Sequence, residues 1–336
     1  MIVQAQKPAA LLLIAVLAAC GDSTTSSDNT GGAGGTIPAP TVEEGVYDFL
    51  ATELNFYYPE GLSESDTDAT NLCGLDTITD NTTYRPLLFD DVVVNGFDLD
   101  DAVSTGDSGL CAQADYTGID GSSGVDYGFL GIIDMIRPIR PDQVARGVLA
   151  NAPSEGLINF GIRLSGVESL ENDDSVEVFV APTSEVPLRG TDGRIIPRSS
   201  VPIDPNPEWQ TTFRGQIVDG VLTTEPADFT LGNIDLIIVF DRVLELRGAR
   251  IRATFTEIRE GVIEVDSILA GWWSNDNMID TIGDIVLAIG ANDGELQCSA
   301  EMWADGSSDG TSCDMTSMIF RTVSVSGFLT GFEEAN

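Results

Sequence analysis

The densest group of side chains that could bind a ligand lies in a Gly-rich segment from Gly96 to Asp126. It holds seven aspartates: Asp98, Asp100, Asp101, Asp107, Asp115, Asp120 and Asp126. Calcium takes about six to eight oxygen ligands, which Asp-rich loops readily supply. The EF-hand pattern fails, because Ala102 and Val103 occupy two of its required positions. The composition fits solvated turns. The alternative is a metal site formed by these aspartates, with calcium as the candidate cofactor. A run at 305–310 is a weaker candidate of the same kind.

Two adjacent tryptophans, Trp272 and Trp273, are the candidate ligand-binding aromatic residues. Neighbouring side chains on a strand point to opposite faces, so one ring is expected in the core and the other could stack on a sugar. Glycosidases use two carboxylates roughly 5–10 Å apart. Glu264 and Asp266 share one face of an expected strand, although chance pairs are also expected among 54 acidic residues.

Missing residue types exclude several mechanisms. The chain has no histidine, and its single lysine is Lys7. Relays that need an imidazole, imidazole metal sites, Schiff-base lysines and phosphate-loop lysines are therefore excluded. The formal net charge of −38 argues against nucleic acid as a partner, because phosphate binding depends on clustered Lys and Arg. No catalytic residue is predicted.

The N-terminus has the pattern of a secretion signal. Lys7 precedes an apolar run from Ala9 to Ala19, which is shorter than the roughly 20 residues that cross a bilayer. The ending Leu17-Ala18-Ala19-Cys20 is typical of a bacterial lipoprotein. We predict a signal peptide over residues 1–19 and a lipid, such as palmitate, on Cys20.

Four cysteines remain after Cys20, an even number that favours two disulfides in an exported protein. Three pairings are possible. Local pairing, Cys73–Cys111 and Cys298–Cys313, closes the shortest loops and is the one that we predict.

Three regions follow the signal peptide. Residues 20–40 read as a flexible Gly/Ser/Thr-rich tether, and residues 41–336 as a single globular domain. Within that domain, residues 41–155 are rich in helix and loop signals and residues 156–336 in strand signals. No second hydrophobic span follows, so the lipid is the expected anchor.

Hydrophobic periodicity predicts the elements of the domain. Helical spacing predicts helices at 41–55, 126–137, 141–149 and 274–289, and the first of these opens with a capping box at residues 41–44. Alternation or apolar runs predict strands at 158–164, 176–180, 234–240, 249–255, 262–269 and 316–332, with a hairpin at Asp219-Gly220. We expect a mainly β fold, an antiparallel β-sandwich or barrel-like sheet with a few short helices and long Asp/Gly-rich loops.

Several short segments share a pattern with known sequences. GFDLDD, then Cys111, Asp115-Tyr116 and IDGSSGVD, resemble uncharacterised secreted lipoproteins of myxobacterium-like bacteria, as does Ser312-Cys313 before a β-rich end. The resemblance covers residues 90–336, and Tyr127 stands where that pattern has Asn. No activity is attached to the group, so the resemblance implies no functional residue.

Together these patterns predict a lipid-anchored, exported binding or structural protein of the cell envelope, on the periplasmic face or the cell surface. Its membrane contact is expected through the lipid, and its partner is expected to be an envelope protein or a glycan. A carboxylate-dependent carbohydrate-active enzyme or a calcium-dependent carbohydrate-binding module is the alternative.

Overall fold

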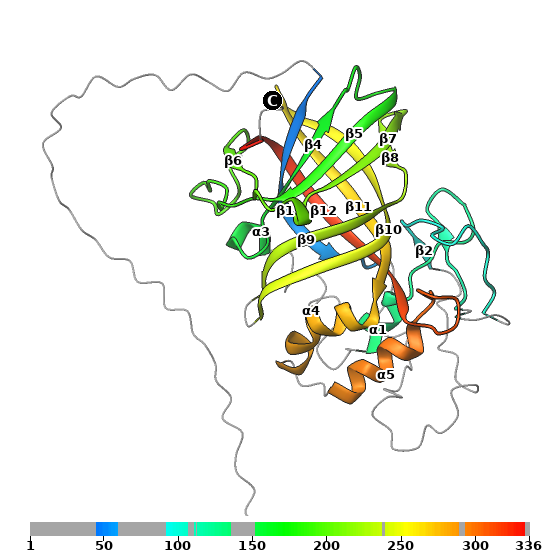
Figure 1. The fold of residues 1–336 in the computed structure, drawn as a ribbon. Coiled ribbons are helices and arrows are strands. Elements are labelled where there is room, and N and C mark those ends of the chain that lie inside the picture. Colours follow the sequence, from blue (N-terminus) through cyan, green and yellow to red (C-terminus); the bar gives the residue numbers. More distant parts are fainter. Residues whose placement is uncertain are drawn as a thin grey trace, which may run out of the picture. The chain divides into compact units, whose positions relative to one another are not determined.

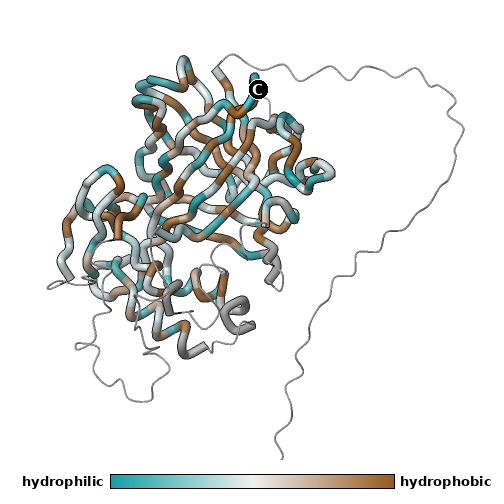
Figure 2. Tube along the Cα trace, turned by 180° about the vertical axis from the view of Figure 1, so that it is seen from behind, coloured by the Kyte–Doolittle hydropathy of each residue, from teal (hydrophilic) through white to brown (hydrophobic). Residues whose placement is uncertain are grey.

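Alternating apolar and polar residues form long strands in this protein, and the alternation is visible along the chain in Figure 2. The computed structural model describes residues 45–59, 92–106, 111, 113–135, 152–236, 239–288 and 293–332. The strands are β1 (Tyr47–Phe56), β2 (Val93–Val94), β3 (Thr117–Gly118), β4 (Phe160–Ser165), β5 (Asp173–Pro182), β6 (Ser200–Pro202), β7 (Thr211–Val218), β8 (Val221–Thr224), β9 (Ala227–Leu236), β10 (Val239–Arg259), β11 (Val262–Ser274) and β12 (Met315–Thr330). Residues Thr41–Asn336 form one compact unit.

The main sheet closes on itself (Figure 1). Its strands follow the order β1-β4-β5-β7-β8-β10-β11-β12, and β12 pairs back with β1. Every pair along this path is antiparallel, whereas β6 adds to β12 in parallel and β9 pairs with β10. The mainly β prediction is confirmed, and the closed, barrel-like sheet is the form that it takes.

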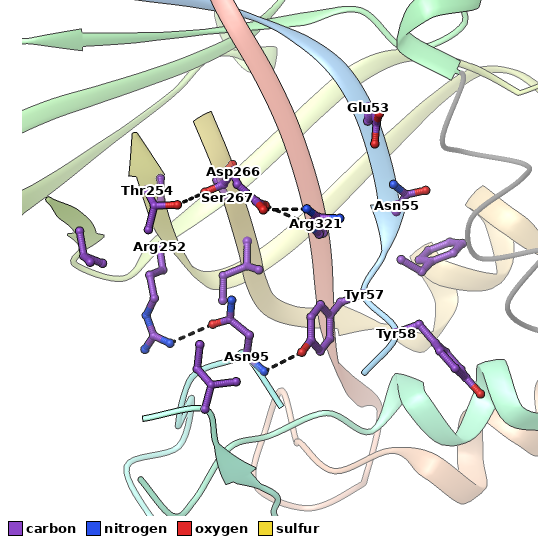
Figure 3. A pocket seen from close by; sticks show the side chains of 15 residues that line it. Glu53, Asn55, Tyr57, Tyr58, Asn95, Arg252, Thr254, Asp266, Ser267 and Arg321 are labelled. Carbon is purple, nitrogen blue, oxygen red and sulfur yellow. Dashed lines mark hydrogen bonds and ion pairs between the residues drawn. The ribbon is translucent and has the colours of Figure 1, made fainter. Parts of the chain in front are cut away.

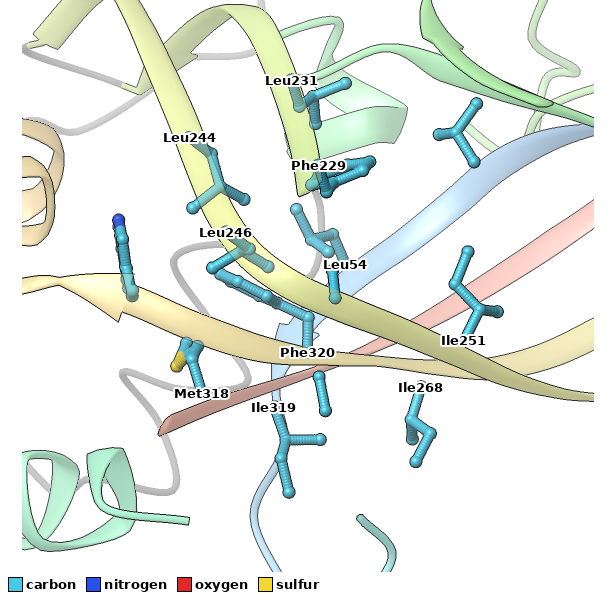
Figure 4. Packing of buried hydrophobic residues seen from close by; sticks show 14 of the residues in the cluster. Leu54, Phe229, Leu231, Leu244, Leu246, Ile251, Ile268, Met318, Ile319 and Phe320 are labelled. Carbon is cyan, nitrogen blue, oxygen red and sulfur yellow. The ribbon is translucent and has the colours of Figure 1, made fainter. Parts of the chain in front are cut away.

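Apolar side chains fill the inside of the closed sheet. Leu54, Ile251 and Phe320 pack there with residues of β9 and of the first half of β10 (Figure 4). The cavity among them measures about 30 Å³. A water molecule needs roughly 10–15 Å³ by this kind of measure, so this interior cavity is too small for a larger ligand.

A second apolar cluster covers part of the outer face of the sheet. Leu50, Ala181, Val201, Ile203 and Leu329 are all buried in it. Val201 lies on β6, whose backbone pairs with the end of β12. The connection between β5 and β7 supplies this short strand and the 3-10 helix η3 (Pro207–Trp209).

The helices α1 (Phe129–Met135), α4 (Asn275–Ala288) and α5 (Asp293–Trp303) lie together beneath one end of the sheet, and α3 (Ala152–Glu155) lies beside β1 (Figure 1). The helix predicted at 274–289 is present as α4, and Ser274 caps it, since its hydroxyl accepts a hydrogen bond from the backbone N–H of Asn277 at 3.2 Å. None of the described helices is long and apolar enough to cross a membrane.

The helix predicted at 41–55 is wrong, because Tyr47–Phe56 forms β1. A spacing of four residues, as between Leu50 and Leu54, fits both a helix face and a period of two. A bulge between Ala51 and Glu53 then moves the two leucines to opposite sides, with Leu50 in the outer cluster and Leu54 in the inner core. Residues 41–44 lie outside the described residues.

The single strand predicted at 234–240 is also wrong. β9 ends at Leu236 and β10 begins at Val239, and these two residues pair with each other. The apolar run therefore belongs to two antiparallel strands. The Asp219-Gly220 hairpin is confirmed, and both residues have the positive φ that a type I′ turn requires. The helix predicted at 141–149 lies outside the described residues.

Candidate functional site

A disulfide joins the Asp-rich segment to the turn before β12. Cys111 bonds Cys313, with 5.3 Å between their Cα atoms, although the two cysteines are 202 positions apart in sequence. Both predicted local pairs are therefore wrong: Cys298 is disulfide-bonded but not to Cys313, and Cys73 lies outside the described residues. Loop length guided the prediction, whereas the fold places two distant loops side by side.

Three of the seven predicted calcium ligands converge. One carboxylate oxygen from each of Asp98, Asp100 and Asp126 lies within 4.8 Å of the others. Oxygens bound to one calcium ion at about 2.4 Å would be separated by at most about 4.8 Å, so the three fit a shared ion. We refer to them as the aspartate triad.

Local backbone contacts fix the triad. Antiparallel bonds between Tyr116 and Val125 bring the end of the segment back on its beginning, and the N–H of Leu99 donates to Asp126 Oδ2 at 2.6 Å. Gly124 has φ of +90°, and a Cβ there would lie 2.8 Å from Asp98 Oδ2. A glycine is therefore required beside the triad.

Ionisation of the aspartate triad is unfavourable, because burial and neighbouring negative charges disfavour the carboxylate form. Burial raises the pKa of Asp126 to about 9, and the charges of Asp305, Asp100 and Asp115 add to this effect against the Leu99 hydrogen bond. Burial likewise raises the pKa of Asp115 to about 6, with contributions from the charges of Asp100 and Asp98. A divalent cation would relieve this repulsion, so the triad with neighbouring Asp115 is the candidate metal centre.

The other predicted ligands lie elsewhere or are engaged otherwise. Asp101 has φ of 57°, points to solvent and pairs with Arg250 at 3.7 Å. Asp120 accepts hydrogen bonds from the backbone and side chain of Ser122. Both are in tight turns, and neither belongs to the triad. Asp107 lies outside the described residues. The seven-residue prediction was thus too broad.

The weaker candidate at 305–310 is a hydrogen-bonded turn. The carboxylate of Asp305 accepts hydrogen bonds from the N–H of Gly128, at 3.0 Å, and from the N–H and hydroxyl of Ser317. Burial raises the pKa of Asp305 to about 7 against these hydrogen bonds. Asp309 accepts in turn from Thr311. Both aspartates therefore stabilise the loop through hydrogen bonds.

The two tryptophans do not form a sugar platform. Trp273 is buried, packs against Phe129 and Phe320, and donates its indole N–H to Asn277 at 2.7 Å. That ring is inaccessible, so its predicted ligand role is wrong. Trp272 points to the opposite face, as expected, but its half-buried ring lies over Gly306, where a Cβ would come within 2.5 Å.

A groove of about 610 Å³, lined by both polar and apolar side chains, lies on the outer face of the sheet (Figure 3). Its floor comes from β1, β10, β11 and β12, and its wall from the chain after β1 and from the Asp-rich segment. The main lining residues are Tyr57, Asn95, Arg252, Thr254, Asp266 and Arg321. Glu264, the expected partner of Asp266, is exposed and does not line the groove.

Neighbouring groups hold the groove side chains in place. Arg321 donates two hydrogen bonds to Asp266, at 2.9 and 2.7 Å. Arg252 donates to the side-chain oxygen of Asn95 at 3.1 Å, and its guanidinium lies 4.7 Å from the ring centre of Phe97. The N–H of Asn95 donates to the Tyr57 hydroxyl at 3.0 Å. Fixed polar groups of this kind are typical of preorganised binding sites.

Sequence reasoning missed this groove. The alternation from Ala249 to Phe255 does place Arg252 and Thr254 on the outer face of a strand. The sequence carries no signal that Asn95 and Tyr57 lie against that face. No family model, curated protein or solved structure matches the chain.

Proposed function

We propose that this protein is an exported, lipid-anchored binding protein of the cell envelope, and that the groove on the outer face of its sheet is the binding site. The single observation that carries the binding role is that groove, about 610 Å³ in volume and lined by fixed polar side chains. The lipoprotein signal ending at Cys20 supports the location.

A binding role is favoured over catalysis by Asp266 because of the hydrogen bonds that this carboxylate makes in the groove. Both carboxylate oxygens of Asp266 accept hydrogen bonds from Arg321. A general acid must instead carry a transferable proton, and a nucleophile must present a free oxygen to the substrate. The bidentate pair thus suits a positioning role for Asp266.

Retention on isolated cell envelopes tests the proposal. The chain starting at Gly21, without the lipid-bearing Cys20, is mixed with envelopes, and bound protein is measured after washing. Thr254→Trp places an indole in the groove and should abolish retention. Thr256→Trp is the matched control, since Thr256 is exposed on the same strand but does not line the groove. Equal retention of wild type and Thr254→Trp would overturn the proposed site.

The lipid anchor is tested separately. The full chain should incorporate labelled palmitate and fractionate with membranes, whereas Cys20→Ala should lose the label. Label that persists in Cys20→Ala would contradict lipidation at this residue, without bearing on the groove.

A further inference from the structure

We infer that the ligand of the groove is a neutral oligosaccharide, an inference that rests on the proposed binding function. It draws on the balance of charge in the groove, on hydrogen-bond donors left available there, and on the pairing of the strands beneath it.

The charges of the groove cancel. Its lining contributes two arginines, Arg252 and Arg321, and two carboxylates, Glu53 and Asp266. Hydrogen bonds from Ser122, helped by the charge of Arg252, hold the pKa of nearby Asp120 below its ordinary value, so Asp120 stays ionised beside Arg252. Because the whole chain carries −38 as well, nothing in the groove offsets the repulsion of an anionic ligand.

Arg252 nevertheless has donors to offer. Within the described part of the chain, Asn95 is the one residue that accepts a hydrogen bond from this guanidinium, through Nη1. Nε and Nη2 therefore remain for a ligand. Phe97 and Asn95 fix the group in advance, which lowers the entropy cost of binding. Available donors without net positive charge suit hydroxyl and ring oxygens.

The lining also matches the two kinds of surface on a sugar. Tyr57, Ile119 and Val221, which are half-buried or exposed, supply apolar area for the C–H face of a ring. Hydroxyl groups both donate and accept, and the groove offers acceptor oxygens in the exposed Glu53 carboxylate as well as the Arg252 donors. Aromatic side chains with a few convergent polar groups are the usual composition of small-ligand sites.

An extended peptide is a poorer fit. Peptides commonly bind sheets by adding a strand to a free edge. Beneath the groove, β10 pairs with β8 and β11, β11 with β12, and β12 with β1. No backbone edge is therefore open on this floor, and recognition must come from side chains.

Calorimetric titration of the chain starting at Gly21 tests this inference. The probes are short neutral oligosaccharides of glucose, galactose, mannose and N-acetylglucosamine, with uronic acid oligosaccharides as the charged arm. At least one neutral probe should bind. Arg252→Met should raise its Kd about tenfold through loss of the guanidinium hydrogen bonds. Arg214→Met, an exposed arginine outside the groove, should leave Kd unchanged.

Thr254→Trp should abolish binding, and Thr256→Trp should not. If Thr254→Trp fails to fold, Arg252→Met still decides the question. Tighter binding of uronic acids, or sugar binding that neither groove variant weakens, would overturn the inference. Envelope retention that depends on the groove, with no oligosaccharide bound, would overturn the sugar ligand while leaving the proposed function standing.

Discussion

The acidic residues of this chain differ in ionisation behaviour because their surroundings differ. Asp101 and Asp126 both belong to the Asp-rich segment, yet one points to solvent and the other is buried against like charges. Burying a carboxylate costs free energy unless a cation or a proton neutralises it. Both pH and calcium should therefore change the stability of the protein through Asp126.

Asp126 should make the metal-free protein less stable as pH rises. Its pKa of about 9 in the fold exceeds the ordinary value of 3.8, so the folded state holds the proton over this range and the unfolded state does not. The stability that it contributes is complete below pH 4 or so and is lost as pH rises toward 9. In EDTA, Asp126→Asn should flatten the pH dependence of the melting temperature, while Asp101→Asn should not.

Calcium should act on the same residue in the opposite direction. At pH 8 or so, where a cation replaces the proton, saturating calcium should raise the melting temperature of wild type by several degrees, since a ligand at 100 times its Kd contributes about 2.7 kcal/mol. Asp126→Asn should lose most of this gain, and Asp101→Asn should keep it. An unchanged wild-type melting temperature with calcium and with EDTA would exclude the aspartate triad as a calcium site.

Among the elements, β10 does the most to organise the molecule. Its outer residues Arg250 and Arg252 donate hydrogen bonds to the carbonyl of Asp98 in the Asp-rich segment and to the side chain of Asn95 just before it. Its first half extends with β9 past the closed sheet and contacts α4. Regular alternation predicts a strand here from sequence. It does not predict which distant loop each outward side chain will meet.

Asn277 should be the residue that holds α4 to β10. Its side-chain oxygen accepts from the Trp273 indole and from the N–H of Glu245, and its amide donates to the carbonyl of Val243. Asn277→Ala leaves these groups unpaired and should lower the free energy of unfolding by about 2–3 kcal/mol, measured by urea titration. Asp276→Ala, an exposed change in the same turn, should cost less than about 0.5 kcal/mol. Equal effects would contradict the role of Asn277.

The Cys111–Cys313 disulfide should stabilise the contact between the Asp-rich segment and the turn before β12. Replacing both cysteines with serine should lower the free energy of unfolding by about 2–4 kcal/mol, because the bond closes a very long loop. Non-reducing peptide mapping checks the pairing itself. A Cys73–Cys111 or Cys298–Cys313 peptide in that map would contradict the pairing found in the fold.

At the scale of the whole molecule, the net charge of −38 opposes compaction. Few arginines are available to offset it, and several of them are used in specific contacts such as those of Arg321 and Arg163 with Asp266 and Asp48. Surface repulsion of this size acts over long distances at low ionic strength and is screened by salt.

The melting temperature should therefore rise with NaCl, measured in EDTA so that calcium cannot contribute. Most of the gain should be complete near 1 M, where the Debye length is about 3 Å. An uncharged osmolyte at equal osmolality controls for solvent exclusion and should give a smaller rise. A flat or falling response to NaCl would show that self-repulsion does not limit stability.

The sequence by itself determined the mainly β character, the Asp219-Gly220 hairpin and the capped helix after Ser274, because these depend on residues close together in the chain. It also identified the segment that contains Asp98, Asp100 and Asp126. Only the tertiary structure decided closure through β1 and β12, the Cys111–Cys313 bond and the meeting of Tyr57 and Asn95 with Arg252. Those contacts join residues tens to hundreds of positions apart, where local periodicity carries no information about which surfaces will meet.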